Sequence, residues 1–199
     1  EKKEKEFPSI ISLKILLNLI TLSLVFIASF FITTNVEIQK IIWILAIFLL
    51  ADSFSYLLSC FFRARQQMQY EALAKIFQTL ILTGAGFFIL FNFPSAEGLS
   101  YAYLFAGFCS LLLLLLFFIK INSLKIGWQT FVWKKYLLMS WPLALIGGLT
   151  MLYNQIDSVM MGRWNQITET GWYNASYRIA GAVLIVNGFI SASFYPALS

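Results

Sequence analysis

The sequence predicts an all-α protein, a polytopic transmembrane bundle of about six helices. Sixty per cent of its residues are hydrophobic and 12% are charged, too few polar residues to cover a water-soluble core. The apolar residues also form long blocks, comparable to the roughly 20 residues that a helix needs to cross the hydrocarbon layer. These blocks show no period-two alternation and exceed the length of a barrel strand, which argues against β-structure.

Six blocks are long enough to cross a bilayer as helices. They cover residues 10–33, 41–62, 73–91, 99–119, 136–161 and 172–197. The breaks between them contain residues that end helices: Asn35 and Glu37 mark the first turn, and residues 168–171 mark the last. Between the third and fourth blocks, Pro94 cannot continue a helix and Ser95 can cap the next one.

The basic residues are distributed asymmetrically about these blocks. Three of the fourteen Lys and Arg residues flank one side, namely Lys40, Arg163 and Arg178. The other eleven flank the opposite side, in the N-terminal arm and the second and fourth loops: Lys2, Lys3, Lys5, Lys14, Arg63, Arg65, Lys75, Lys120, Lys125, Lys134 and Lys135. The positive-inside rule therefore predicts that the N-terminal end is cytoplasmic.

Several function classes are disfavoured by composition. The chain has no His, so neither metal ligation by His nor general-base catalysis by His is possible. It also has no P-loop, nucleophile elbow or CxxC motif. Cys60 and Cys109 lie inside apolar runs and are interpreted as plain membrane-embedded thiols. The net charge of +5 is spread over loops, so no nucleic-acid partner is expected, and neither is a metal or cofactor. Glu1 at the start and the apolar run at the end predict an internal piece of a longer protein.

Asp52 is a candidate binding residue near the middle of the second predicted helix. Tyr56, Ser59 and Arg63 follow it at steps of four, three and four, so the four side chains share one helical face. Two interpretations are open. The stripe is either the wall of a wet cavity or a set of interhelical hydrogen bonds that holds the bundle together.

A second polar group belongs to the last two predicted helices. Asn154 and Tyr153 precede Asp157 by three and four residues, so the three side chains lie on one side of the fifth helix. Arg178 lies about two turns into the sixth helix, at a depth predicted to match that of Asp157. The pair is either a static salt bridge or two cavity residues, with Arg178 attracting a phosphate and Asp157 titrating or binding a cation.

Residues that bend or tighten helices also recur. Pro142, Gly147 and Gly148 in the fifth predicted helix are candidate hinge residues for alternating access. Five other glycines are predicted to allow close helix packing: Gly84, Gly86, Gly107, Gly181 and Gly188.

Three stretches resemble polysaccharide flippases, the polysaccharide transport branch of the superfamily that includes multidrug and toxin extruders. SWPLAL at 140–145 with LYNQIDSVMMG at 152–162 resembles that family's seventh helix, and TGWYNASYRI at 170–179, ending at Tyr195-Pro196, resembles the eighth. RARQ at 63–66, with Tyr70 and Lys75, resembles the join between the fourth and fifth.

The resemblance implies helices three to eight of a two-lobe transporter. Residues 1–121 would complete an N-terminal lobe, 122–135 would form a cytoplasmic linker, and 136–199 would open the second lobe. It also implies flipping of undecaprenyl-diphosphate-linked oligosaccharide, a precursor of O-antigen, capsule or exopolysaccharide, across the inner membrane of a bacterium or archaeon. Alternating access would be driven by a proton or sodium gradient. The partners would be the bilayer, the lipid-linked oligosaccharide, the rest of the chain and glycan-assembly proteins.

Two alternatives are kept. The flippase predicts a large cavity lined by cations, whereas a multidrug or cation antiporter of the same fold predicts a cavity dominated by acidic residues. A membrane-embedded enzyme such as a glycan polymerase predicts large polar loops, and every loop here is short. Arg63 and Arg178 favour the flippase, because its substrate carries a diphosphate.

Overall fold

The helical prediction is confirmed throughout the part of the chain that can be described. The computed structural model describes residues 2–33, 35–92, 94–121, 127, 130–164 and 166–181, and no strand occurs within these ranges. The chain divides into two compact units, Glu1–Lys135 and Tyr136–Ser199, which are treated separately below. The interpretation of these units as parts of two transporter lobes stays a prediction.

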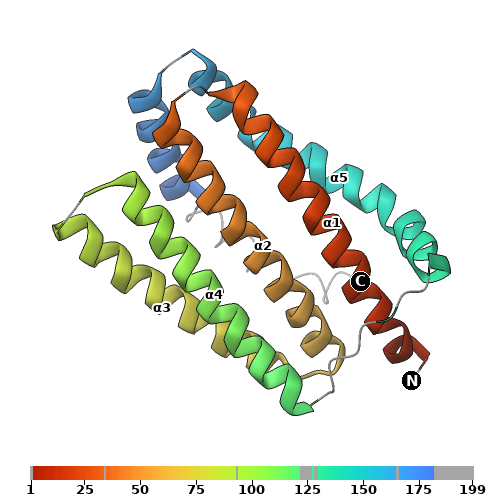
Figure 1. Ribbon diagram of the computed structural model, residues 1–199. Coiled ribbons are helices and arrows are strands. Elements are labelled where there is room, and N and C mark those ends of the chain that lie inside the picture. The colour runs from red at the N-terminus through yellow and green to blue at the C-terminus, as the bar shows by residue number, and fades with distance from the viewer. Residues whose placement is uncertain are drawn as a thin grey trace, which may run out of the picture. The chain divides into compact units, whose positions relative to one another are not determined.

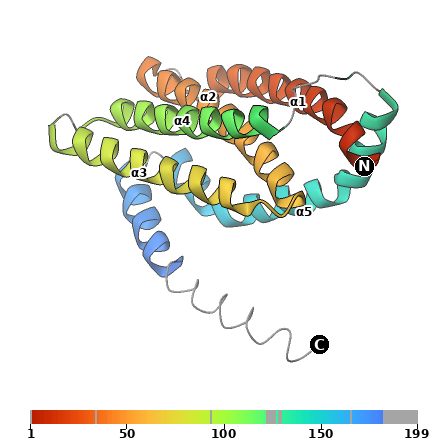
Figure 2. The same ribbon diagram turned by 90° about the horizontal axis from the view of Figure 1, so that it is seen from below.

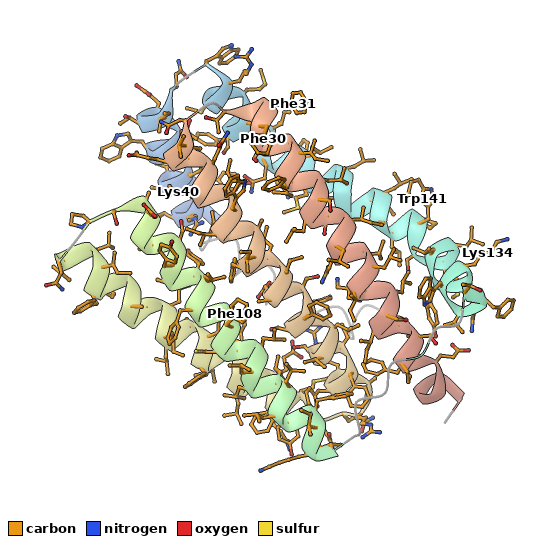
Figure 3. All side chains as sticks on the ribbon, in the orientation of Figure 1. Phe30, Phe31, Lys40, Phe108, Lys134 and Trp141 are labelled. Atoms are coloured by element: carbon orange, nitrogen blue, oxygen red, sulfur yellow. The ribbon has the colours of Figure 1, made fainter. Side chains whose placement is uncertain are left out.

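Five helices have defined bounds: α1 (Lys2–Ile32), α2 (Val36–Ala64), α3 (Met68–Asn92), α4 (Ala96–Ile121) and α5 (Thr130–Arg163). A further helix covers residues 167–181, and the remainder of the predicted span 172–197 lies outside the described residues. All five bounded helices are long and apolar enough to cross a membrane. Phe31 on α1 and Phe108 on α4 are 87% and 42% exposed, as expected for side chains that face lipid (Figure 3).

Local side-chain chemistry explains where the helices begin. The Asn35 side chain accepts a hydrogen bond from the Glu37 backbone N–H at 3.0 Å and so caps α2. Ser95 caps α4 as predicted, because its hydroxyl accepts from the Gly98 N–H at 3.1 Å. The α2–α3 connection is a tight turn in which Gln66 has a φ of 59°, a left-handed conformation that is unusual for a residue with a Cβ.

In the first unit, α2 lies at the centre of the bundle. It contacts α1, α3 and α4, and α4 also packs along α3 (Figures 1 and 2). The core lies where the end of α2 meets the start of α3 and the end of α4. Phe61 packs against Phe118 with ring centroids 4.9 Å apart, and Phe62 packs against Tyr70 at 5.2 Å. This aromatic cluster closes one end of the bundle and holds the polar faces of the three helices together.

The start of α5 differs from the sequence prediction, which placed a loop up to residue 135. The helix begins at Thr130, and its first turns are anchored to the beginning of α1. The Trp133 indole N–H donates to the Ser9 carbonyl at 2.8 Å, and the Lys135 ammonium pairs with the Glu6 carboxylate at 3.3 Å. The Ser12 hydroxyl also donates to the Gly127 carbonyl at 2.7 Å. These contacts explain why polar residues extend the helix beyond its apolar stretch.

Close packing at glycine is found in α4. A Cβ on Gly107 would lie 2.7 Å from the Phe48 ring of α2, so that position requires glycine or a shift of the ring. At Gly84 and Gly181 a Cβ would meet no atom of the described residues within 4 Å, so packing among those residues does not require glycine there. At Gly86 the nearest atom would be at an ordinary 3.9 Å, and Gly188 lies outside the described residues.

Candidate functional site

A polar cavity of about 250 Å³ lies between α2, α3 and α4 in the first unit. The stripe predicted on α2 forms one of its walls, so Asp52, Tyr56 and Arg63 come together in the cavity. The polar lining residues come from all three helices: Asp52, Ser55, Tyr56, Ser59, Arg63, Glu71, Lys75, Gln78 and Ser110. Charged groups inside a membrane bundle are costly unless they pair or line a wet space, and here they do both.

Arg63 and Glu71 form a paired group at one end of this cavity. The Arg63 Nε donates to Glu71 Oε2 at 2.6 Å, and its Nη2 donates to Oε1, so the contact is bidentate. The side chains are 46% and 24% exposed, so the pair lies at an opening rather than in the core. The Arg63 guanidinium also lies 5.7 Å from the centre of the Tyr56 ring. Arg63 is therefore already neutralised by a carboxylate, which weakens its predicted role as a phosphate ligand.

The second charged pair is connected through a neutral amide. The Lys75 ammonium donates to the Gln78 side-chain oxygen at 3.1 Å, and the Gln78 amide N–H donates to the Asp52 carboxylate at 3.4 Å. Gln78 is buried, with 8% exposure. Its side-chain oxygen faces the Lys75 ammonium and its amide N–H faces the Asp52 carboxylate, so each end of the amide suits the charge beside it. Asp52 and Lys75 are thus held in one chain without direct contact within salt-bridge distance.

Five of the polar lining residues were not predicted as site residues: Ser55, Glu71, Lys75, Gln78 and Ser110. A signal existed for three of them, because Glu71, Lys75 and Gln78 follow at steps of four and three, the same one-face spacing as on α2. Ser110 gave no such signal. It lies in an apolar run, and its hydroxyl donates to the Ala74 carbonyl across the helices at 3.5 Å.

In the second unit, Asp157 and Arg178 do not form a salt bridge, which was one of the two arrangements that the sequence left open. Asp157 instead accepts a hydrogen bond from the Tyr173 hydroxyl at 2.8 Å, and the neighbouring Ser158 donates to the Asn174 side-chain oxygen at 3.1 Å. Arg178 is exposed, and no acidic group of the described residues lies within 4 Å of its guanidinium.

The difference comes from where the last helix begins. Asp157 lies six residues before the end of α5, and Tyr173 lies six residues after the start of the helix at 167, so the two meet across the hairpin. Arg178 lies five residues further on, or about 7.5 Å deeper at 1.5 Å per residue. The sequence prediction began this helix at residue 172 and therefore placed Arg178 at the depth of Asp157.

The remaining candidates lie in α5. Asn154 and Tyr153 are exposed, like Asp157 itself. Helix α5 continues through Pro142, and a Cβ at Gly147 or Gly148 would meet no atom within 4 Å. Packing within the described chain therefore does not require glycine at these two positions, and the hinge stays a prediction. In the described ranges, no group of three acidic or thiol side chains could hold a metal ion.

The long apolar helices indicate a multi-pass membrane protein. The chain belongs to the polysaccharide biosynthesis protein family, whose model matches residues 1–199. This match confirms the resemblance to polysaccharide flippases seen in the sequence. No curated protein and no solved structure matches the chain.

Proposed function

We propose that this chain is part of a transporter that flips undecaprenyl-diphosphate-linked oligosaccharide across the plasma membrane of a bacterium or archaeon. The observation that carries the proposal is the mixed-charge cavity between α2, α3 and α4, in a chain of the polysaccharide biosynthesis family. Apolar helices need no such cavity for packing, whereas a polar head group needs a route around the hydrocarbon. Alternating access, a proton or sodium gradient and a cytoplasmic N-terminal end complete the proposal.

The exposed arginine of the second unit favours this function over a cation antiporter. The flippase predicts a cavity lined by cations and the antiporter predicts an excess of acidic groups, but this cavity holds two acidic and two basic side chains and fits neither prediction. In the second unit, Arg178 is an exposed cation with no acidic partner among the described residues, so it is available to a phosphate.

The test is flipping of a fluorescent polyprenyl-diphosphate sugar in proteoliposomes that contain the full-length protein. Wild type is expected to flip the lipid, and Arg178→Ala is expected to slow it by about tenfold or more, because a charge-assisted hydrogen bond to phosphate is lost. Arg163→Ala is the matched control, an exposed arginine at the end of α5 whose loss should leave the rate unchanged. A wild-type protein that flips no such lipid but exports cationic dyes would establish the antiporter instead.

A further inference from the structure

The cavity between α2, α3 and α4 has no net positive charge to offer a diphosphate. Its two acidic and two basic side chains balance, and Arg63 donates to the Glu71 carboxylate through the Nε–Nη2 edge of its guanidinium. Lys75 donates to Gln78 and faces Asp52 through that amide. An anion that enters here would meet two carboxylates, Asp52 and Glu71, whose repulsion opposes its binding.

Hydrogen-bonding groups nevertheless stay available to a neutral ligand. The Asp52 carboxylate can accept about four hydrogen bonds, and one long bond from Gln78 uses only part of that capacity. The hydroxyls of Ser59 and Tyr56 face the cavity and make no hydrogen bond to another described residue. By contrast, the Ser55 hydroxyl is used locally, since it donates to the Ala51 carbonyl at 3.0 Å. The open groups therefore combine strong acceptors with hydroxyls that both donate and accept.

An apolar surface accompanies these polar groups. Tyr56 is 60% exposed and lies one helical turn from Asp52. The Arg63 guanidinium lies over one face of its ring, 5.7 Å from the centre, so a ligand ring would stack on the opposite face. A pyranose ring has the complementary character, because hydroxyls radiate from its rim while the C–H groups of one face are apolar. Carboxylate and amide groups bind vicinal hydroxyls, and the aromatic face covers the C–H groups.

The size of the cavity limits the ligand. At about 250 Å³ it falls below the roughly 300–1,000 Å³ of pockets that enclose drug-sized molecules. It can therefore hold one sugar ring with little surrounding water, but not an oligosaccharide with its diphosphate.

We infer that this cavity is a subsite for one uncharged hexopyranose ring of the transported glycan, and that the diphosphate binds elsewhere. The inference rests on the proposed function and names the part of the substrate that these residues recognise. Asp52 and Ser59 bind ring hydroxyls, Tyr56 stacks on the ring, and the Arg63–Glu71 pair closes the opening. Recognition of a lipid-linked glycan is thereby divided between a neutral sugar subsite and a separate cationic site.

The test measures binding of free glycosides to the purified full-length protein by calorimetry. The probes are the methyl glycosides of glucose, galactose, mannose and N-acetylglucosamine, with inorganic pyrophosphate as competitor. At least one glycoside should bind saturably, and pyrophosphate should not displace it. Asp52→Asn should weaken binding by about tenfold, because a charged acceptor is replaced by a neutral amide of the same shape.

Two further variants keep the test decisive. Glu37→Gln is the matched control, an exposed carboxylate in the first turn of α2 that does not line the cavity, and should change the affinity by less than about twofold. Ser59→Ala removes one open hydroxyl without breaking a hydrogen bond among the described residues. It should weaken binding severalfold, and it serves as the test if Asp52→Asn does not fold. The inference is overturned if none of the four glycosides binds, or if pyrophosphate competes with them.

Flipping assays separate this inference from the proposed function. If glycosides bind in the manner expected but no polyprenyl-linked sugar is flipped, the sugar subsite stands and the flippase proposal fails. If wild type flips the lipid while no glycoside binds and Asp52→Asn flips at the wild-type rate, the flippase stands and the subsite is wrong.

Discussion

The two units of this chain use similar apolar helices in different ways. In the first unit, residues of α2 and α4 interlock around Phe62, Leu114 and Phe118, which are at most 2% exposed. In the second, the most apolar stretch of α5 buries none of its residues, and Tyr153 is 81% exposed. Composition alone therefore makes a membrane-spanning helix, but burial requires neighbours of matching shape. Charge follows a similar division, since the first unit gathers four ionic side chains around one cavity while the second leaves Asp157 and Arg178 exposed and unpaired with each other.

The largest difference in unfolding free energy between the two units is expected when one aromatic side chain in each is replaced by alanine. Phe62→Ala removes a fully buried ring from the core and should lower the free energy of unfolding by about 3–5 kcal/mol. Tyr153→Ala removes an exposed ring from α5 and should cost less than about 0.5 kcal/mol. Thermal unfolding of the full-length protein in detergent, followed by circular dichroism, checks both values. An equal loss in the two variants would show that α5 is packed against a part of the protein outside the described residues.

Replacing glycine by alanine should change the free energy of unfolding by a smaller amount than the aromatic truncations, and with opposite sign in the two units. In Gly107→Ala the new methyl would lie 2.7 Å from the Phe48 ring, and the clash should cost about 1–3 kcal/mol. In Gly148→Ala the methyl enters open space and should stabilise the helix by up to about 1 kcal/mol.

The same replacement tests the hinge proposed for α5. A variant with both Gly147→Ala and Gly148→Ala should fold normally and flip lipid several-fold more slowly, because a stiffer helix resists bending. The flipping assay in proteoliposomes checks the rate, with Gly84→Ala, another glycine in open space, as the control. A wild-type rate in the double variant would exclude a hinge role for these glycines.

The smallest difference is expected between two serine hydrogen bonds. Ser29 is fully buried and accepts from the Trp43 indole N–H at 3.1 Å, so Ser29→Ala leaves that donor unpaired and should cost about 1 kcal/mol. Ser158 donates to Asn174 at a more accessible position, and Ser158→Ala should cost about 0.5 kcal/mol because other hydrogen-bond partners can replace it. Melting temperatures of the two variants, compared under one condition, would contradict this ranking if Ser158→Ala were the less stable.

Most of the fold could be predicted from the sequence, because long apolar blocks dictate spanning helices wherever they occur. The helix ends were less predictable. Helix α1 begins at Lys2 rather than residue 10, and α5 at Thr130 rather than 136, since helices continue through charged turns beyond the apolar stretch. At α5 the extension also depends on the contact between Trp133 and Ser9, which are distant in the sequence.

The candidate site was only partly predictable. Helical spacing identified the face of α2 with Asp52 and Arg63, because that face is set within one helix. Helical spacing could not show that the Glu71 carboxylate pairs with the Arg63 guanidinium, because this pairing depends on the turn around Gln66. The position of Arg178 was misjudged for a related reason. Depth in a helical hairpin depends on the first residue of the second helix, and an error of five residues moves a side chain by more than one turn.

The arrangement of Gln78 has an electrical consequence. An amide is a dipole without net charge, and here its negative end faces an ammonium group while its positive end faces a carboxylate. A dipole aligned in this way stabilises both ions while keeping them apart, so neither cancels the other by contact. The cavity thereby retains a local electric field despite its zero net charge. A polar but uncharged molecule can orient in such a field. Because it carries no net charge, it can leave the cavity without an accompanying counterion.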